Sequence, residues 1–164
     1  MKKQFFLLML FTMSVFKLFA QPSAAAPTPP ARNASDVISL FSDAYTDLAG
    51  TDWFPNWGQS TIVTDVTVSG NATKRYATLN YQGIDISGSI NVSSMQYLHV
   101  DIWTANCTAF EIFLINEGIG EQGYTITPTA SGWKSVDIPL TQYNSVALSN
   151  VGQIKLVGTP FGSS

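Results

Sequence analysis

The stretch Tyr97–Trp103, YLHVDIW, decides the fold of this chain. It alternates strictly, with aliphatic side chains at every second position and polar or aromatic side chains between them. Such a period of two predicts a strand in a sheet that has a core side and a solvent side. The core side would carry Leu98, Val100 and Ile102, and the other side His99, Asp101 and Trp103.

Short segments with similar patterns follow one another through most of the chain. Gly, Asn and Pro separate them, and no segment keeps a helical period, apart from a short turn within 141–150. A glycine-rich loop is expected at 117–123. The expected strands are 37–45, 61–69, 74–81, 84–92, 97–104, 109–116, 124–127, 133–138 and 153–157.

Many short strands with this punctuation predict an all-β fold, an antiparallel β-sandwich of the jelly-roll kind. Trp133 starts one of the alternating segments, and we expect it to pack between the sheets. The last expected strand ends close to the final residue. We therefore expect a sandwich that lacks its last strand and leaves 153–157 without an edge partner.

The first 33 residues differ in composition from the rest. Lys2 and Lys3 precede an apolar run at 5–16 that is too short to span a bilayer comfortably. This pattern predicts a signal peptide at 1–20, with an uncleaved anchor as the alternative, and hence an exported protein. Residues 21–33 are rich in Pro and Ala, which predicts an exposed, semi-extended linker. Residues 34–164 suffice for one domain with a proper core.

The charge balance is acidic. The chain has 8 Lys and Arg against 11 Asp and Glu, and without residues 1–20, which hold three lysines, the net charge is −6. A chain with so few cations is a poor partner for nucleic acid or an anionic membrane and suits a neutral ligand. The single cysteine, Cys107, excludes an internal disulfide framework, so stability must come from core packing or from a metal.

The loop 51–60, TDWFPNWGQS, is the first candidate binding segment. It holds three aromatic side chains beside Gly, Pro and Asn. They could form a stacking platform or fold back as a plug over the core. Of the two indoles we favour Trp57 over Trp53, because Asn56 and Gln59 flank it with hydrogen-bonding groups.

The second candidate group combines Tyr81 and Gln82 with the polar side of 97–103. Aromatic rings pack on the C–H faces of sugars, and planar polar side chains bond sugar hydroxyls. Alternatively, His99 and Asp101 pair with each other, or with a backbone group, under a covering loop. The expected ligand-binding residues are Trp53, Trp57, Tyr81, Gln82, His99, Asp101 and Trp103.

Three acidic residues, Asp43, Asp47 and Asp52, lie near the end of the first expected strand. Close carboxylates and loop carbonyls are oxygen ligands that suit calcium, so Asp43 and Asp47 are candidate ligands of a structural calcium ion. Their spacing is not that of an EF-hand, and the alternative is a solvated acidic loop. No other cofactor is expected.

The sequence offers little for catalysis. A glycosidase needs two carboxylates roughly 5–10 Å apart. Of the three glutamates, Glu111 lies among apolar residues, while Glu117 and Glu121 lie in the glycine-rich loop. His99 is the only histidine, and one His with one Cys makes a poor zinc site or catalytic triad. We therefore expect that the chain is not an enzyme, with a hydrolase as the least favoured alternative.

Four phrases of the sequence, taken together, resemble one family. They are VISLFSDAYTD (37–47), GNATKRYATLNYQGIDI (70–86), MQYLHVDIWTANCTAFEIFLI (95–115) and GWKSVDIPLTQYNSVAL (132–148). They resemble an accessory β-sandwich module that occurs beside laminarinase-type family 16 glycoside hydrolases in secreted proteins of marine Bacteroidetes. The resemblance covers nearly all of residues 26–160.

This resemblance implies a non-catalytic carbohydrate-binding module with a galactose-binding-like jelly roll, in a secreted or periplasmic bacterial protein. It implies a laminarin-type β-glucan as the first ligand to test, and a glycoside hydrolase catalytic domain as partner in a longer parent protein. Family members continue with one more strand, which carries a Tyr-Ile-Asp-Asn-like stretch that this chain does not reach. The residues leave open a structural spacer whose exposed aromatic side chains contact a neighbouring domain.

Overall fold

The computed structural model describes residues 21–163, so the predicted signal peptide at 1–20 lies outside the described residues. Within the described range no helix has the length and apolar character needed to cross a membrane. The elements in chain order are η1 (Ala34–Asp36), β1 (Ile62–Val68), β2 (Asn71–Ala77), β3 (Tyr81–Ile90), β4 (Tyr97–Thr104), β5 (Ala109–Asn116), β6 (Gly120–Ile126), β7 (Gly132–Pro139), η2 (Leu140–Gln142) and β8 (Val151–Thr159).

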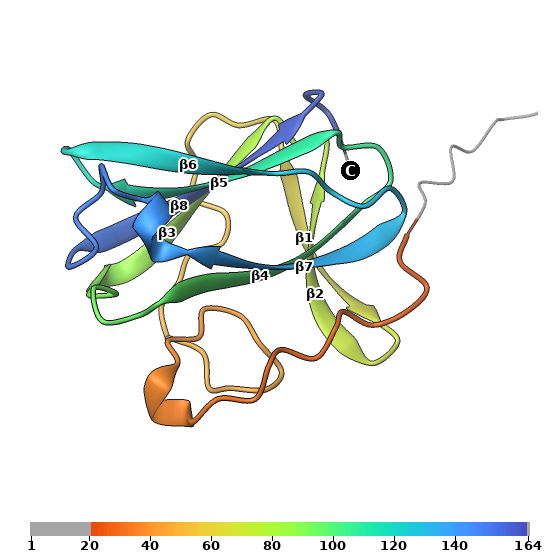
Figure 1. Ribbon diagram of the computed structural model, residues 1–164. Helices are drawn as coiled ribbons and strands as arrows, with labels where there is room; N and C mark the ends of the chain where they lie inside the picture. Colours follow the sequence, from red (N-terminus) through yellow and green to blue (C-terminus); the bar gives the residue numbers. More distant parts are fainter. Residues whose placement is uncertain (1–20, 164) are drawn as a thin grey trace, which may run out of the picture.

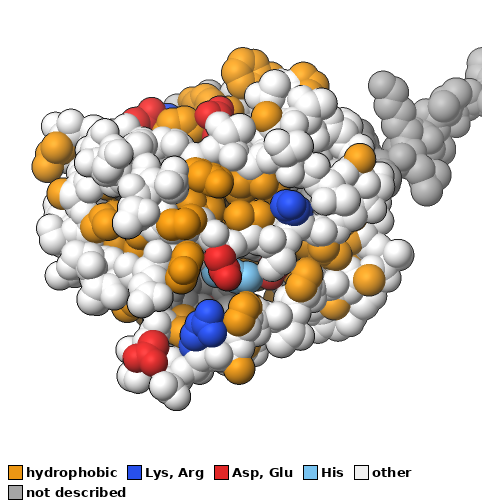
Figure 2. All heavy atoms as spheres, viewed as in Figure 1, with side chains coloured by type: hydrophobic (Ala, Val, Ile, Leu, Met, Phe, Trp, Pro, Cys, Tyr) orange, Lys and Arg blue, Asp and Glu red, His pale blue; other side chains and the backbone are white. Residues whose placement is uncertain are grey.

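Two antiparallel sheets form the layers of a sandwich (Figure 1). The larger sheet has the strand order β3-β8-β5-β6, and the smaller sheet consists of β4 and β7. β1 and β2 form an antiparallel ribbon beside them. Hydrophobic side chains gather between β6 and β7 on the side of the molecule that Figure 2 shows. The all-β antiparallel sandwich predicted from the sequence is confirmed.

Alternation within the strands places the core between the two sheets. Leu98, Val100 and Ile102 pack against it from β4, as their spacing predicts. Tyr143, in the connection between β7 and β8, is almost fully buried and donates its hydroxyl to the Ile112 carbonyl at 3.0 Å. The larger sheet contributes to this core Ile84, Ile86, Phe110, Ile112, Leu114, Ile126, Val151, Ile154 and Leu156.

The last strand lies in the middle of the larger sheet. β8 pairs with β3 on one side and with β5 on the other. The expectation that this strand lacks an edge partner is therefore wrong. The error arises because both partners are distant in sequence, and the pattern within a strand does not reveal which strands it joins. After β8 the chain returns to Leu79, whose N–H donates to the Ser163 carbonyl at 2.8 Å.

The expected first strand, 37–45, is not a strand. A single bridge joins Ser39 to Asp47, and the rest of this segment forms no strand. Other strand boundaries also differ from those expected. β2 ends at Ala77 and a separate strand starts at Tyr81, while β6 begins at Gly120, inside the expected glycine-rich loop.

Candidate functional site

The outer surface of the larger sheet, which we call the four-strand face, brings together side chains from four strands. The strand register arranges them in rows across the sheet. Because neighbouring strands lie about 4.8 Å apart, each row spans roughly 14 Å. The rows are Tyr81, Val157, Glu111 and Thr125; then Gly83, Lys155, Phe113 and Gly123; then Asp85, Gln153, Ile115 and Glu121.

The indole of Trp57 lies over the middle row. The loop that carries it runs along the free edge of β3, where the backbones of Asp52 and Asp85 exchange hydrogen bonds of 2.8 and 2.9 Å. The ring then rests on Gly83, where any Cβ would overlap it. Tyr81 fixes the loop by donating its hydroxyl to the Trp57 carbonyl at 2.6 Å. The half-buried ring is thereby held flat against the sheet.

Beside the indole, a cation occupies the middle of the face. The Lys155 ammonium group lies 4.2 Å from the centre of the Phe113 ring and forms an ion pair with Glu121. Phe113 in turn packs on Gly123, where a Cβ would come within 2.6 Å of the ring. These contacts hold an aromatic ring and a hydrogen-bond donor in fixed positions next to Trp57.

The outer rows carry fixed polar groups. Gln153 donates its amide to the Asp85 carboxylate at 2.9 Å, and Thr125 donates its hydroxyl to Glu111 at 3.3 Å. Together with Glu121, these rows hold three carboxylates against the single positive charge of Lys155 among the described residues of the face. The face is therefore negatively charged at neutral pH.

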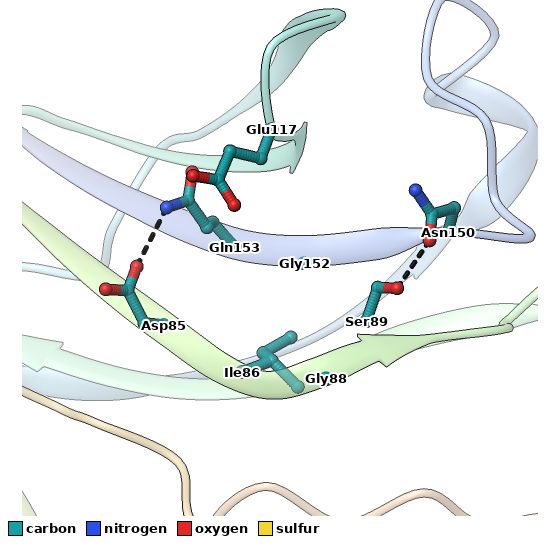
Figure 3. A pocket seen from close by; sticks show the side chains of 8 residues that line it. All are labelled: Asp85, Ile86, Gly88, Ser89, Glu117, Asn150, Gly152 and Gln153. Atoms are coloured by element: carbon teal, nitrogen blue, oxygen red, sulfur yellow. Dashed lines mark hydrogen bonds between the residues drawn. The ribbon is translucent and has the colours of Figure 1, made fainter.

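A hollow of about 420 Å³ continues this face beyond Asp85 and Gln153 (Figure 3). Glycines at 88 and 152 leave the space open, and Glu117 reaches over it from the turn between β5 and β6. Ser89 donates its hydroxyl to Asn150 at the far end. The hollow adds a carboxylate, an amide and a hydroxyl to the polar groups of the face.

The outer surface of the smaller sheet, which we call the two-strand face, carries the second predicted group. In its register Trp103 lies opposite Trp133, and His99 lies opposite Asp137. His99 is held between two carboxylates, with Nδ1 2.7 Å from Asp137 and Nε2 3.4 Å from Asp101. Figure 2 shows the imidazole in a hollow beside an acidic side chain. The pairing of His99 with Asp101 is the arrangement that the sequence left as the alternative to sugar binding.

Trp133 does not pack between the sheets, which corrects the expectation from its sequence. Alternation in β7 turns Val136 and Ile138 towards the core and therefore turns Trp133 outwards. Its indole Nε1 donates to the Ala24 carbonyl at 2.9 Å.

Two other predicted ligand residues are structural. Gln82 is fully buried, because alternation turns it to the core side of β3, opposite to its neighbour Tyr81. It reaches neither outer face of the sandwich, so we leave it out of the site that we propose. Trp53 packs against the core and edge-on against Phe41, with 5.6 Å between ring centroids, and Lys74 lies over both rings. Trp53 thus covers the core, which is the alternative that the sequence left open for this loop.

The predicted ligand residues that remain lie on opposite outer surfaces of the sandwich. Trp57 and Tyr81 belong to the four-strand face, whereas His99, Asp101 and Trp103 belong to the two-strand face. A single ligand site cannot use both groups.

The candidate calcium ligands point to different partners. Asp43 accepts hydrogen bonds from the Asn71 side chain and the Ala72 N–H, at 2.6 and 3.2 Å. Asp47 accepts the Ser39 hydroxyl at 2.5 Å. Within residues 21–163 there is no group of three or more His, Cys, Asp or Glu side chains that could hold a metal ion. The calcium expectation therefore gains no support from the geometry.

Sequence reasoning missed the polar residues that β8 contributes. Gln153 and Lys155 alternate with core residues, and this pattern places them on one side of a strand. Nothing local shows that this side meets Gly83 and Phe113 from two other strands. The sequence therefore showed which side of the strand these two residues occupy, but not which residues of other strands lie beside them.

No model of a protein family and no curated protein matches the sequence. Among solved structures the chain is similar to the family 11 carbohydrate-binding module of the cellulosomal cellulase Lic26A-Cel5E of Clostridium thermocellum. The identity is 23%, the match covers 70% of this chain and 80% of that one, and the TM-score is 0.47.

The chain is also similar to the carbohydrate-binding module CBM28, described as specific for non-crystalline cellulose. This match has 15% identity, covers 88% of this chain and 92% of that one, and has a TM-score of 0.51. It shows that the two chains share the β-sandwich fold.

Proposed function

We propose that this protein binds a neutral polysaccharide on the four-strand face and does not cleave it. The observation that carries the proposal is the Trp57 indole held flat on Gly83, beside a row of fixed polar side chains. A ring fixed in this way offers its outer surface to the C–H face of a sugar, and the amide, ammonium and carboxylate groups around it match sugar hydroxyls.

The charge of the face favours a neutral polymer over an anionic one. Three carboxylates surround one ammonium group, and Glu117 adds a fourth carboxylate at the hollow, so a polymer of uronic acids would be repelled. The family resemblance makes a laminarin-type β-glucan the first ligand to test. The specificity of the CBM28 module for non-crystalline cellulose supports a β-glucan as well.

The carboxylates of the face have partners of their own. Glu121 is in an ion pair with Lys155, and Glu111 accepts the Thr125 hydroxyl. This arrangement supports binding over hydrolysis. With the predicted signal peptide and the family resemblance, we place the protein outside the cytoplasm of a bacterium, as an accessory module that concentrates an attached glycoside hydrolase on its substrate.

Native affinity electrophoresis of residues 21–164 tests the proposal. Gels would contain laminarin, mixed-linkage glucan, xylan, alginate or no polymer. We expect retardation in at least one β-glucan gel and none in alginate. A parallel assay for reducing sugar should detect no release. Equal mobility in every gel, from protein shown to be folded, would favour the spacer function instead.

Two variants locate the binding face. Trp57→Ala should weaken binding about tenfold or more, because it removes the stacking surface. Trp103→Ala is the matched control, since it makes the same change on the opposite face and should leave mobility unchanged. The reverse pattern would move the site to the two-strand face.

A further inference from the structure

Residues 22–32, which we call the proline-rich segment, form no helix or strand and contact Trp133 at the start of β7, Ser69 in the turn between β1 and β2, and Tyr45 in the loop before β1. In Figure 1 the segment runs, in red to orange, from near the start of β7 past β2 towards η1. Four hydrogen bonds anchor it. Ser69 donates to the Ser23 carbonyl at 3.0 Å, Trp133 to the Ala24 carbonyl at 2.9 Å and Tyr45 to the Pro30 carbonyl at 3.3 Å, and the Arg32 N–H donates to the Tyr45 hydroxyl at 3.0 Å.

The chemistry of these anchors suits a proline-rich ligand. Prolines at 22, 27, 29 and 30 have no N–H group and favour an extended backbone, so the segment offers more carbonyl acceptors than N–H donors. Proteins recognise such backbones with aromatic side chains that carry a donor at the edge of a flat apolar ring. Trp133 and Tyr45 are side chains of this kind, and both donate to carbonyls of the segment.

The two indoles of the two-strand face are covered by groups outside the core. Trp103 and Trp133 are half-buried, yet neither is among the described hydrophobic residues that pack against the core. Each indole is the cross-strand neighbour of the other, and Trp133 also contacts the proline-rich segment through Nε1.

We infer that Trp133 on the two-strand face, Ser69 in the β1–β2 turn and Tyr45 in the loop before β1 together form a docking surface for a proline-rich extended backbone, and that residues 22–32 of the same chain occupy it. The docked segment fixes the direction in which the chain enters the sandwich. It also assigns Trp133 to holding the chain's own backbone instead of a sugar. This inference stands independently of the glycan assignment to the other face.

Limited proteolysis of the full chain tests the docking. Arg32 is the only Lys or Arg between residues 18 and 73, so tryptic cleavage after it reports release of the segment. The double variant Tyr45→Phe/Trp133→Phe keeps an aromatic ring at both positions and removes three hydrogen bonds, two donated by these side chains and one accepted by the Tyr45 hydroxyl. Each lost hydrogen bond should speed this cleavage about fivefold, because cleavage follows the population of the open state. A rate equal to that of the parent would overturn the inference.

The control is Tyr97→Phe/Trp103→Phe, which makes the same two changes at β4 positions that have no hydrogen bond to the segment in the described structure. It should be cleaved after Arg32 at the parent's rate, and acceleration equal to that of the test variant would refute recognition through the donors. Lys134 and Lys155 lie within strands, so slow cleavage there shows that the sandwich stays folded. Protection that disappears on dilution would mean that the segment docks on a second copy, which also contradicts the inference.

Discussion

At the scale of single residues, the four-strand face depends on two glycines, because a side chain at either position would displace an aromatic ring. Gly83 gives Trp57 room to lie flat, and Gly123 does the same for Phe113. A glycine inside a strand costs stability, and close approach of a ring is one of the reasons that justify it. The position of the proposed stacking ring is therefore encoded in a residue on another segment.

Gly83→Ala should reduce polysaccharide binding about as much as Trp57→Ala does, by roughly tenfold or more. The added methyl group overlaps the indole and must displace it from the sheet. Affinity electrophoresis measures the effect. Gly120→Ala is the control, since nothing lies within 4 Å of its Cβ position. Unchanged binding by Gly83→Ala would show that the flat indole is not the sugar platform.

At the scale of elements, Asn116 connects the end of β5 to the loop between η2 and β8. Its side chain is buried, donates to the carbonyls of Ala147 and Asn150 at 3.0 and 2.7 Å, and accepts the Ala147 N–H at 2.6 Å. Asn150 in turn accepts the Ser89 hydroxyl at the end of the hollow. One buried amide thus positions a loop that carries no regular strand.

Asn116→Ala should lower the free energy of unfolding by about 2–4 kcal/mol, because it leaves buried backbone groups without partners. Urea unfolding followed by tryptophan fluorescence measures this loss. The exposed Asn144 provides the control, and Asn144→Ala should change stability by less than about 0.5 kcal/mol. A similarly small effect at Asn116 would contradict the anchoring role.

At the scale of the whole molecule, two tyrosines link stability to pH. Burial raises the pKa of both Tyr76 and Tyr143, with smaller contributions from Asp65 and Tyr124 respectively. Above pH about 10 a tyrosine in the unfolded chain loses its proton, whereas these two keep theirs while the protein is folded. The unfolded state is therefore favoured as the pH rises, and stability decreases.

We expect the free energy of unfolding to fall by about 1.4 kcal/mol per pH unit for each of these tyrosines above pH about 10. Tyr143→Phe should remove one of the two contributions and so about halve that slope. Urea titrations between about pH 8 and 11.5 measure it. A parental slope in the variant would show that Tyr143 does not carry the effect.

Local pattern determined the strands and their sides. β4 and β5 have the bounds expected from the sequence, and Leu98, Val100 and Ile102 face the core as expected. Alternation is a property of neighbouring residues, so it survives without knowledge of the partner strands. The same reasoning could have excluded Gln82, which is one residue out of phase with Tyr81.

By itself, therefore, the sequence determined the fold class, most of the strands and, within β4, which side chains face the core. Only the tertiary structure decided that β8 lies between β3 and β5, and that Trp57 and His99 lie on opposite outer surfaces. The physical reason is that strand order and register depend on pairings between distant segments, whose free energy belongs to the whole sheet. A short stretch of sequence therefore cannot predict strand order or register.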